Sequence, residues 1–394
     1  MEVIILAGGL GTRLSTVVHE IPKCLAPVGS YEAGKGRPFL AYQLNWLATY
    51  PVQHVVFSVG YLKEQVIEFV QSREWPFAYD FAEEETPLGT GGAIRLALTK
   101  CRSSKVFVLN GDTFYPVPLD RMPFDYPLTL ALKSMKDSDR YGTVSLSCTK
   151  ITAFHEKQAC PEGLINGGIY AIDRTRLDLS ALPERFSFEK EVLEPGAAKG
   201  LLGGWVSDSY FIDIGIPEDY TRAQWAVPAW FAVKEASKAV LQTSAQTLFL
   251  DRDGVLNRLR PADYVKSWNE WEWMPGILEE FPKWAAKFQN IVLVTNQRGV
   301  GKGVMTDRDL SHIHARMMTE ILDAGGRIDL LLACTAVSED DPRRKPHTGM
   351  FHEAAALLDI KAESSVMLGD APSDAAFAAN CGMDFIPLLP AAVS

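Results

Sequence analysis

The first cluster of residues that could do chemistry is a glycine-rich turn near the start of the chain. The apolar run 3–6 is followed by Gly8, Gly9 and Gly11, and Arg13 lies on the same turn. Glycines let the backbone approach a ligand and adopt positive φ, so successive N–H groups can point at phosphate oxygens. An arginine adds fixed positive charge where a polyphosphate would lie. The turn therefore predicts a nucleotide site, although it has neither a full dinucleotide fingerprint nor a Walker loop.

The second cluster begins where the apolar run 247–250 ends in Asp251, Asp253 and Gly254. A carboxylate can attack a phosphate monoester when Mg²⁺ screens the repulsion between anions, and a neighbouring acid must protonate the leaving oxygen. We predict Asp251 as the nucleophile and Asp253 as the acid/base. Thr295, Asn296 and Gln297 are predicted to bind phosphate and sugar oxygens. Arg344 and Lys345 are predicted to supply positive charge. Asp370 and Asp374 would bind Mg²⁺ together with Asp251 and Asp253.

Two further segments extend the first cluster. Asn110–Asp112 directly follow an apolar run, and Asp213 ends another. Mg²⁺ leaves several positions to water and phosphate oxygens, so Asp112 and Asp213 are enough carboxylates to hold one ion. The segment 86–93 is a second glycine-rich loop, which suits the close approach of a flat base or ribose.

Short apolar runs that alternate with helix-like stretches must position these residues. The runs predicted as strands are 54–60, 106–109, 128–132, 142–146, 210–214, 247–250, 291–294, 330–333 and 365–368. Such alternation indicates parallel α/β sheets, which bind ligands at the carboxyl ends of their strands. We predict two Rossmann-like α/β domains, at 1–233 with a mixed, mainly parallel sheet and at 246–394, joined by a linker at 234–245.

The pattern Gly-Gly-x-Gly-x-Arg-Leu, followed by Pro-Lys-x-Leu-x-Pro-Val, resembles the sugar-1-phosphate nucleotidyltransferases, and the resemblance covers about residues 1–225. It implies that Arg13 and Lys23 are catalytic, with Arg13 on the leaving phosphates and Lys23 on the α-phosphate or the incoming phosphate. The predicted nucleotide-binding residues are Leu6, Ala7, Gly8, Gly9, Gly11, Thr12, Arg13, Lys23, Pro87, Gly89, Thr90, Gly91, Asn110, Gly111 and Asp112. The predicted sugar-phosphate-binding residues are Glu156, Lys157, Asn166, Gly168, Glu189 and Lys190. The loop at 86–93 and the motif Phe-Ser-x-Glu-Lys are most similar to heptose 1-phosphate guanylyltransferases, which implies GTP and a heptose phosphate as substrates.

Asp-x-Asp, Thr, Lys and Gly-Asp-x-x-x-Asp, in this order, resemble the haloacid dehalogenase-like phosphatases over about residues 247–390. Asp-Arg-Asp-Gly, Thr-Asn-Gln and Arg-Lys-Pro-His are similar to the histidinol-phosphate and heptose-bisphosphate phosphatase branch, which implies no large cap domain. That branch usually carries a zinc loop, but here Cys334 stands with Ala336, Asp341 and Arg343 at the other ligand places. One cysteine cannot hold a structural zinc. We therefore expect Mg²⁺ in both domains and no structural zinc.

Composition narrows the class of protein. The chain has 394 residues and a formal net charge of -10, which disfavours general nucleic-acid binding. No apolar run approaches the ~18 residues of a membrane span, and Glu2 stands where a signal peptide has basic residues. The six cysteines show no paired spacing, which is typical of reduced thiols. We expect a cytoplasmic enzyme with small-molecule substrates and without nucleic-acid or membrane partners; its oligomeric state stays open.

Both resemblances agree on a heptose, which implies two consecutive reactions. The 7-phosphate of a heptose 1,7-bisphosphate would be removed, and GMP would then pass from GTP to heptose 1-phosphate. An alternative keeps both chemistries but changes the sugar, for example to mannose 1-phosphate with a general sugar or histidinol-like phosphatase. A non-catalytic sugar-nucleotide-binding regulator is disfavoured, because the predicted catalytic residues are all present.

Overall fold

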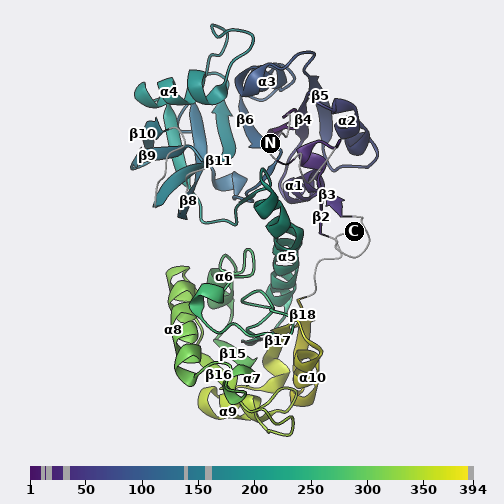
Figure 1. Ribbon diagram of the computed structural model, residues 1–394, viewed down its shortest axis with the longest axis vertical. Helices are drawn as coiled ribbons and strands as arrows, with labels where there is room; N and C mark the ends of the chain where they lie inside the picture. Colours follow the sequence, from purple (N-terminus) through teal and green to yellow (C-terminus); the bar gives the residue numbers. More distant parts are fainter. Residues whose placement is uncertain (10–13, 15–19, 30–35, 137–140, 156–161, 389–394) are drawn as a thin grey trace. The chain divides into compact units, whose positions relative to one another are not determined.

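The computed structural model describes residues 1–9, 14, 20–29, 36–136, 141–155 and 162–388. The chain divides into two compact units, Met1–Trp225 and Ala226–Ser394 (Figure 1). Helix α5 (Pro217–Gln242) contributes residues to both units and includes most of the segment 234–245 that the sequence indicates as a linker. The division between the two units lies within α5, after Trp225. No helix among the described residues is long and apolar enough to cross a membrane.

The first unit is built on a nine-stranded sheet, which is mixed as the sequence predicts. In sheet order its strands are β5 (Ala78–Glu83), β4 (His54–Val59), β1 (Glu2–Leu6), β6 (Lys105–Asn110), β11 (Glu162–Asp173), β8 (Leu128–Lys136), β12 (Leu202–Val206), β10 (Lys150–His155) and β9 (Thr143–Ser147). The strands from β5 to β6 run parallel, whereas β11 is antiparallel to both β6 and β8. The parallel half brings the carboxyl ends of β1 and β6 together, with Leu6 opposite Asn110.

Helices cover the parallel half of this sheet. They are α1 (Phe39–Leu47), α2 (Lys63–Gln71) and α3 (Gly89–Leu98), and a short α4 (Glu194–Ala198) contacts β10. The central strand β1 is apolar on both faces, because Val3, Ile4 and Ile5 are all fully buried. The sheet therefore holds the turn that follows Leu6 on a rigid base.

Two short ladders lie outside the main sheet. β2 (Pro27–Val28) pairs with β3 (Arg37–Pro38), and β7 (Thr113–Phe114) pairs with β13 (Ile212–Asp213), both antiparallel. The strand expected at 210–214 is therefore only two residues long. The chain turns directly after it, because the Asp213 carboxylate accepts a hydrogen bond of 2.7 Å from the Gly215 N–H.

The second unit has an all-parallel sheet in the order β16 (Leu330–Cys334), β15 (Asn290–Asn296), β14 (Thr247–Leu250), β17 (Ser365–Gly369) and β18 (Asp384–Pro387). Its helices are α6 (Phe281–Lys287), α7 (Arg298–Gly301), α8 (Asp307–Asp323), α9 (Gly349–Leu358) and α10 (Pro372–Cys381). Alternate residues of β14 pack on opposite faces: Leu248 and Leu250 join the core cluster with α6, and Phe249 joins the cluster with α9 and α10. All four strands that the sequence predicts in this unit are confirmed, and β18 is additional.

Candidate active sites

The glycine turn and the end of β6 line a first pocket in the first unit. Its lining residues are Leu6, Ala7, Gly9, Lys23, Cys24, Thr90, Asn110, Gly111 and Asp112. Gly111 donates its N–H to the Leu6 carbonyl over 3.0 Å, and a Cβ there would lie 2.5 Å from the same oxygen. Only glycine therefore permits the two strand ends to meet this closely. Gly11, Thr12 and Arg13, which were predicted to complete this site, lie outside the described residues.

The second glycine-rich loop packs against the segment 184–188 and contributes Thr90 to the first pocket. Gly89 has φ +71°, and a Cβ there would lie 2.6 Å from the Phe186 carbonyl oxygen. A Cβ on Gly91 would lie 2.1 Å from the Phe186 ring. Thr90 lines the first pocket, and its hydroxyl accepts a hydrogen bond of 3.0 Å from the Phe188 N–H. Gly8, Pro87, Gly89 and Gly91 do not line the pocket, and Gly89 and Gly91 lie close to Phe186. Their contact with a nucleotide stays a prediction.

The structure brings the predicted carboxylates Asp112 and Asp213 together. Asp213 lies on β13 opposite Thr113, and the Ile214 N–H donates to the Asp112 carbonyl over 3.0 Å. Burial, and then the negative charge of Asp112, raises the pKa of Asp213 to about 6. Lys23 Nζ lies 3.4 Å from Asp112 Oδ2. A divalent cation bound here would reduce the repulsion between the two carboxylates, so this site suits such an ion.

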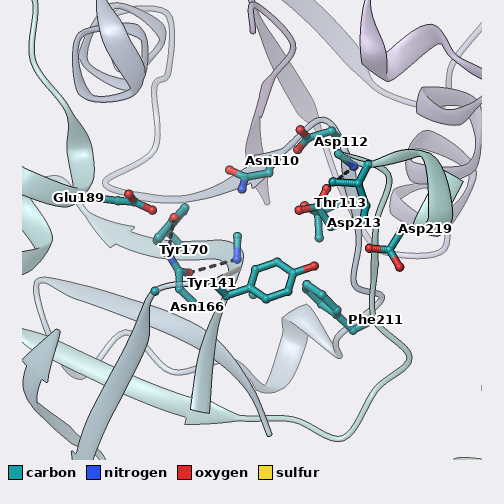
Figure 2. A pocket seen from close by; sticks show the side chains of 15 residues that line it. Asn110, Asp112, Thr113, Tyr141, Asn166, Tyr170, Glu189, Phe211, Asp213 and Asp219 are labelled. Carbon is teal, nitrogen blue, oxygen red and sulfur yellow. Dashed lines mark hydrogen bonds between the residues drawn. The ribbon is translucent and has the colours of Figure 1, made fainter. Parts of the chain in front are cut away.

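A second pocket in the first unit adjoins the first, since Asn110 and Asp112 line both (Figure 2). The lining residues are Asn110, Asp112, Thr113, Tyr141, Gly142, Asn166, Gly167, Gly168, Tyr170, Glu189, Phe211, Asp213, Gly215, Ile216 and Asp219. Figure 2 shows Glu189 and Asn166 on the side away from Asp112 and Asp213. The pocket thus joins the predicted metal carboxylates to three of the predicted sugar-contacting residues. Lys190 does not line it, and Glu156 and Lys157 lie outside the described residues.

Asn166 and Gly168 have defined partners in this second pocket. The Asn166 amide donates to the Tyr170 hydroxyl over 2.8 Å, and its carbonyl oxygen accepts from the Gly168 N–H over 3.1 Å. Gly168 has φ +74°, and a Cβ there would lie 2.5 Å from Asn110 Nδ2. The Asn-Gly-Gly motif therefore shapes the wall of the pocket next to the end of β6.

Sequence reasoning missed an aromatic wall and a buried brace. The rings of Tyr141 and Phe211 meet edge to face with centroids 5.7 Å apart, on the Asp213 side of the second pocket (Figure 2). Gln43 is 1% exposed, and its Nε2 donates to the carbonyls of Asn110 and Thr113 over 2.8 and 2.6 Å. These contacts fix both ends of the loop that carries Asp112. The position of Phe211, two residues before Asp213, could have indicated that it lies at the site. No spacing in the sequence connects Gln43 with the loop that carries Asp112.

In the second unit the carboxyl ends of β14, β15 and β17 carry the predicted catalytic residues. Asp251 follows β14 and Asp370 follows β17, and these strands pair directly. Gly254 has φ +90°, and a Cβ there would lie 2.0 Å from Asp370 Oδ2. The turn after Asp253 can therefore pass the Asp370 carboxylate only as glycine.

Lys345 lies at the centre of this site and is 3% exposed. Its Nζ donates to Asp251 Oδ1 and Asp374 Oδ1 over 2.6 Å each. Burial alone would lower the pKa of Lys345, but the negative charges of Asp251 and Asp374 outweigh burial and raise it. The side chain of Asn296 exchanges two 3.0 Å hydrogen bonds with the backbone of Lys345. Asn296 thus holds the lysine in place.

Asp251, Asp370 and Asp374 form the metal-binding candidate of the described residues, with one carboxylate oxygen from each lying within 4.8 Å of the others. Asp370 Oδ1 is buried and has no hydrogen-bond partner among the described residues. Burial and the charge of Asp374 raise the pKa of Asp370 to about 6. An unpaired buried acceptor in an acidic cluster fits a hard divalent cation such as Mg²⁺.

The Asp253 carboxylate, predicted as a further metal ligand, is not part of this cluster. It accepts two 2.9 Å bonds from Arg252 NH2, one of 3.0 Å from Asn257 and one of 2.7 Å from Gln297. Gln297 also donates to the Thr295 hydroxyl over 2.8 Å. Burial would raise the pKa of Asp253, but these donors, with Arg252 first, lower it.

Arg344 and Cys334 complete the set of residues singled out in the sequence. Arg344 precedes Lys345, and its NH1 atom is buried without a partner among the described residues. The Cys334 thiol lies 3.7 Å from Asp341 Oδ1. The expected absence of zinc stays a prediction.

Comparison with known proteins finds matches in two protein families. The family of nucleotidyl transferases matches residues 2–229, and the HAD-hydrolase-like family matches residues 342–389. A D-glycero-alpha-D-manno-heptose 1-phosphate guanylyltransferase of Aneurinibacillus thermoaerophilus is 42% identical over 229 residues, which are 57% of this chain and 97% of the relative. A D-glycero-alpha-D-manno-heptose-1,7-bisphosphate 7-phosphatase of Mycobacterium tuberculosis is 38% identical over 135 residues, which are 34% of this chain and 71% of the relative.

Crystal structures of HddC from Yersinia pseudotuberculosis, one of them complexed with GMP-PN, superpose with TM-scores of 0.51 and 0.50 at 34% and 35% identity. Each covers 57% of this chain and 97% of HddC. The chain therefore belongs to the nucleotidyl transferase family through residues 2–229 and carries a HAD-hydrolase-like unit after it.

Proposed function

We propose that this protein is a bifunctional enzyme of nucleotide-activated heptose synthesis. The second unit would remove the 7-phosphate of D-glycero-D-manno-heptose 1,7-bisphosphate, and the first would join the heptose 1-phosphate to GMP from GTP. One observation carries this proposal. The chain matches one relative over 229 residues and another over 135 residues, and the two relatives are named for these two heptose phosphates. The product of one reaction would be the substrate of the other.

In the transferase reaction, an oxygen of the sugar 1-phosphate attacks the α-phosphorus of GTP, the bond to the β-phosphate oxygen breaks, and pyrophosphate leaves. We assign GTP to the first pocket and the sugar phosphate to the second, because the two pockets share Asn110 and Asp112. Lys23 would neutralise phosphate oxygens at this junction, together with Arg13. Asp112 and Asp213 would hold Mg²⁺, which would neutralise the triphosphate and favour in-line attack. The protein mainly supplies position and charge.

In the phosphatase reaction, an Asp251 carboxylate oxygen attacks phosphorus, and the bond to the sugar oxygen breaks. The protonated form of Asp253 gives its proton to that oxygen. A water then attacks the aspartyl phosphate, Asp253 takes the proton of the water, and the phosphorus–Asp251 bond breaks. Lys345, which lies 2.6 Å from Asp251, supplies positive charge to the transferring group.

Three groups complete the phosphatase site. Thr295 and Arg344 would bind phosphate and sugar-phosphate oxygens, and the unpartnered NH1 of Arg344 supports its assignment. Asp251, Asp370 and Asp374 would hold Mg²⁺, which would screen the charge between the carboxylate and the phosphate.

A substrate panel tests this proposal. The purified protein with Mg²⁺ is assayed for orthophosphate release from heptose 1,7-bisphosphate, and for pyrophosphate release from each nucleoside triphosphate with heptose 1-phosphate or mannose 1-phosphate. We expect phosphate release from the bisphosphate and the highest transferase kcat/KM with GTP and heptose 1-phosphate. A higher kcat/KM with mannose 1-phosphate would move the assignment to a hexose. No turnover with any pair would overturn it.

A further inference from the structure

The acid/base Asp253 lies beside a buried cation that the proposed chemistry does not use. We propose that Arg252 and His314 act together as positioning residues for the Asp253 carboxylate. This inference rests on the proposed phosphatase reaction, in which Asp253 protonates the leaving oxygen.

Arg252 is the first member of this pair and is fully buried. Its NH2 atom lies 2.9 Å from both Asp253 oxygens, so the guanidinium grips the whole carboxylate rather than one oxygen. Asn257 and Gln297 then bind one oxygen each. These four hydrogen bonds fix the plane of the carboxylate.

His314, on α8, fixes the arginine from its other side. The His314 Nε2 lies 3.3 Å from Arg252 NH1. Burial, and then the charge of Arg252, lowers the pKa of His314 to about 4, so the ring is neutral and its Nε2 can accept a hydrogen bond from the guanidinium. The Arg252 Cζ also lies 5.9 Å from the centroid of the Trp271 ring. A guanidinium held at NH1, at NH2 and over an aromatic ring cannot easily rotate away from Asp253.

Loss of this positioning should affect the transition state more than substrate binding. An acid must point its proton at the leaving oxygen only as the phosphorus–oxygen bond breaks, so a loosened Asp253 slows that step without weakening the ground-state complex. The loss must also depend on the leaving group. A sugar alkoxide needs the proton, whereas p-nitrophenolate leaves well without one.

Three variants of the full-length protein test this inference. His314→Ala removes the acceptor, His314→Gln restores an acceptor oxygen, and His312→Gln changes an exposed histidine on the same helix as a matched control. For each we would measure kcat and KM with Mg²⁺ on heptose 1,7-bisphosphate and on p-nitrophenyl phosphate, with transferase activity as a check on the first unit. We expect His314→Ala to lower kcat on the bisphosphate at least tenfold with KM within about twofold. The kcat on p-nitrophenyl phosphate should fall less than threefold, His314→Gln should recover most of the loss, and His312→Gln should match the wild type.

Equal losses on both substrates, a loss confined to KM, no recovery in His314→Gln, or wild-type kinetics in His314→Ala would each overturn the positioning role. Failure of the proposed function looks different. A wild type that hydrolyses p-nitrophenyl phosphate and another alkyl phosphate, but not the bisphosphate, would contradict the heptose assignment. The same variant comparison would then be made on that alkyl phosphate and would still decide the role of His314.

Discussion

Replacing Lys345 by methionine tests the buried charge network of the second unit. Methionine keeps much of the lysine volume and removes its charge. Asp251 and Asp374, which are 7% and 0% exposed, would then keep their negative charges without the ammonium that lies 2.6 Å from each. Removing one partner of a buried ion pair costs about 3–5 kcal/mol. We expect the low end, about 3 kcal/mol, because one carboxylate can take up a proton instead.

The penalty should grow with pH. Burial raises the pKa of Asp251 to about 7 even with Lys345 present, and loss of the lysine charge must raise it further. A folded-state pKa above the unfolded value of about 3.9 means that the protonated folded form is favoured. The contribution of Asp251 to the stability of the Lys345→Met variant is therefore greatest below about pH 4 and is lost as pH rises through the folded-state pKa. The difference from the wild type should be larger at pH 8 than at pH 6.

Hydrogen exchange followed by mass spectrometry measures this in the full-length protein. Peptides from β14 and β17 should exchange about 150-fold faster at pH 8, since ~3 kcal/mol corresponds to that ratio, after correction for intrinsic rates. Peptides from β1 and β4 in the first unit serve as the internal control and should not change. Lys345→Met combined with Asp374→Asn should recover part of the protection. Protection of β14 and β17 within a few-fold of the wild type, or a penalty larger at pH 6 than at pH 8, would refute the reasoning.

Three other perturbations have defined outcomes. Gly254→Ala adds a Cβ 2.0 Å from Asp370 Oδ2 at φ +90°. We expect the phosphatase kcat/KM to fall at least tenfold and the transferase activity to stay within twofold of the wild type. Equal loss of both activities would contradict a local effect. Gln43→Leu leaves the carbonyls of Asn110 and Thr113 without the Gln43 donor. A buried acceptor that loses its donor costs about 1–3 kcal/mol, so the transferase kcat/KM should fall roughly 5- to 150-fold. Phosphatase activity serves as the control. Asp213 has a pKa of about 6 before metal binds, so it should lose affinity for Mg²⁺ as pH falls through 6 because protons compete for the carboxylate. Titrating transferase activity with Mg²⁺ at pH 5.5 and 7.5 measures this loss. Equal Mg²⁺ midpoints at the two pH values would contradict the prediction.

The strand ends were the predictable part of both sites. Buried runs such as 247–250 and 106–109 end directly in Asp251 and Asn110, and a parallel sheet must bring such ends to one edge. The full length of strand β11 was harder to predict. β11 carries Gly167 and Gly168 within a strand, which weakens the sequence pattern of an extended segment.

Contacts between distant elements escaped prediction for a different reason. The pairing of Asp253 with Gln297, of Lys345 with Asp374, and of Gly91 with Phe186 depends on how side chains pack in three dimensions. The glycines of the segment 86–93 show the limit of motif reasoning, because the same residue type suits both a bound base and a packed ring. Composition and spacing cannot distinguish those two uses.

The order of the two reactions is the central claim, and the Asp251→Asn variant tests it most directly. The variant and the wild type would be incubated with heptose 1,7-bisphosphate, GTP and Mg²⁺, and the sugar nucleotides identified by mass spectrometry. We predict that the wild type makes GDP-heptose without a 7-phosphate. Asp251→Asn should make no sugar nucleotide from the bisphosphate, yet form GDP-heptose from heptose 1-phosphate at the wild-type rate. A GDP-heptose that still carries the 7-phosphate, formed by the variant at the wild-type rate, would contradict the claim.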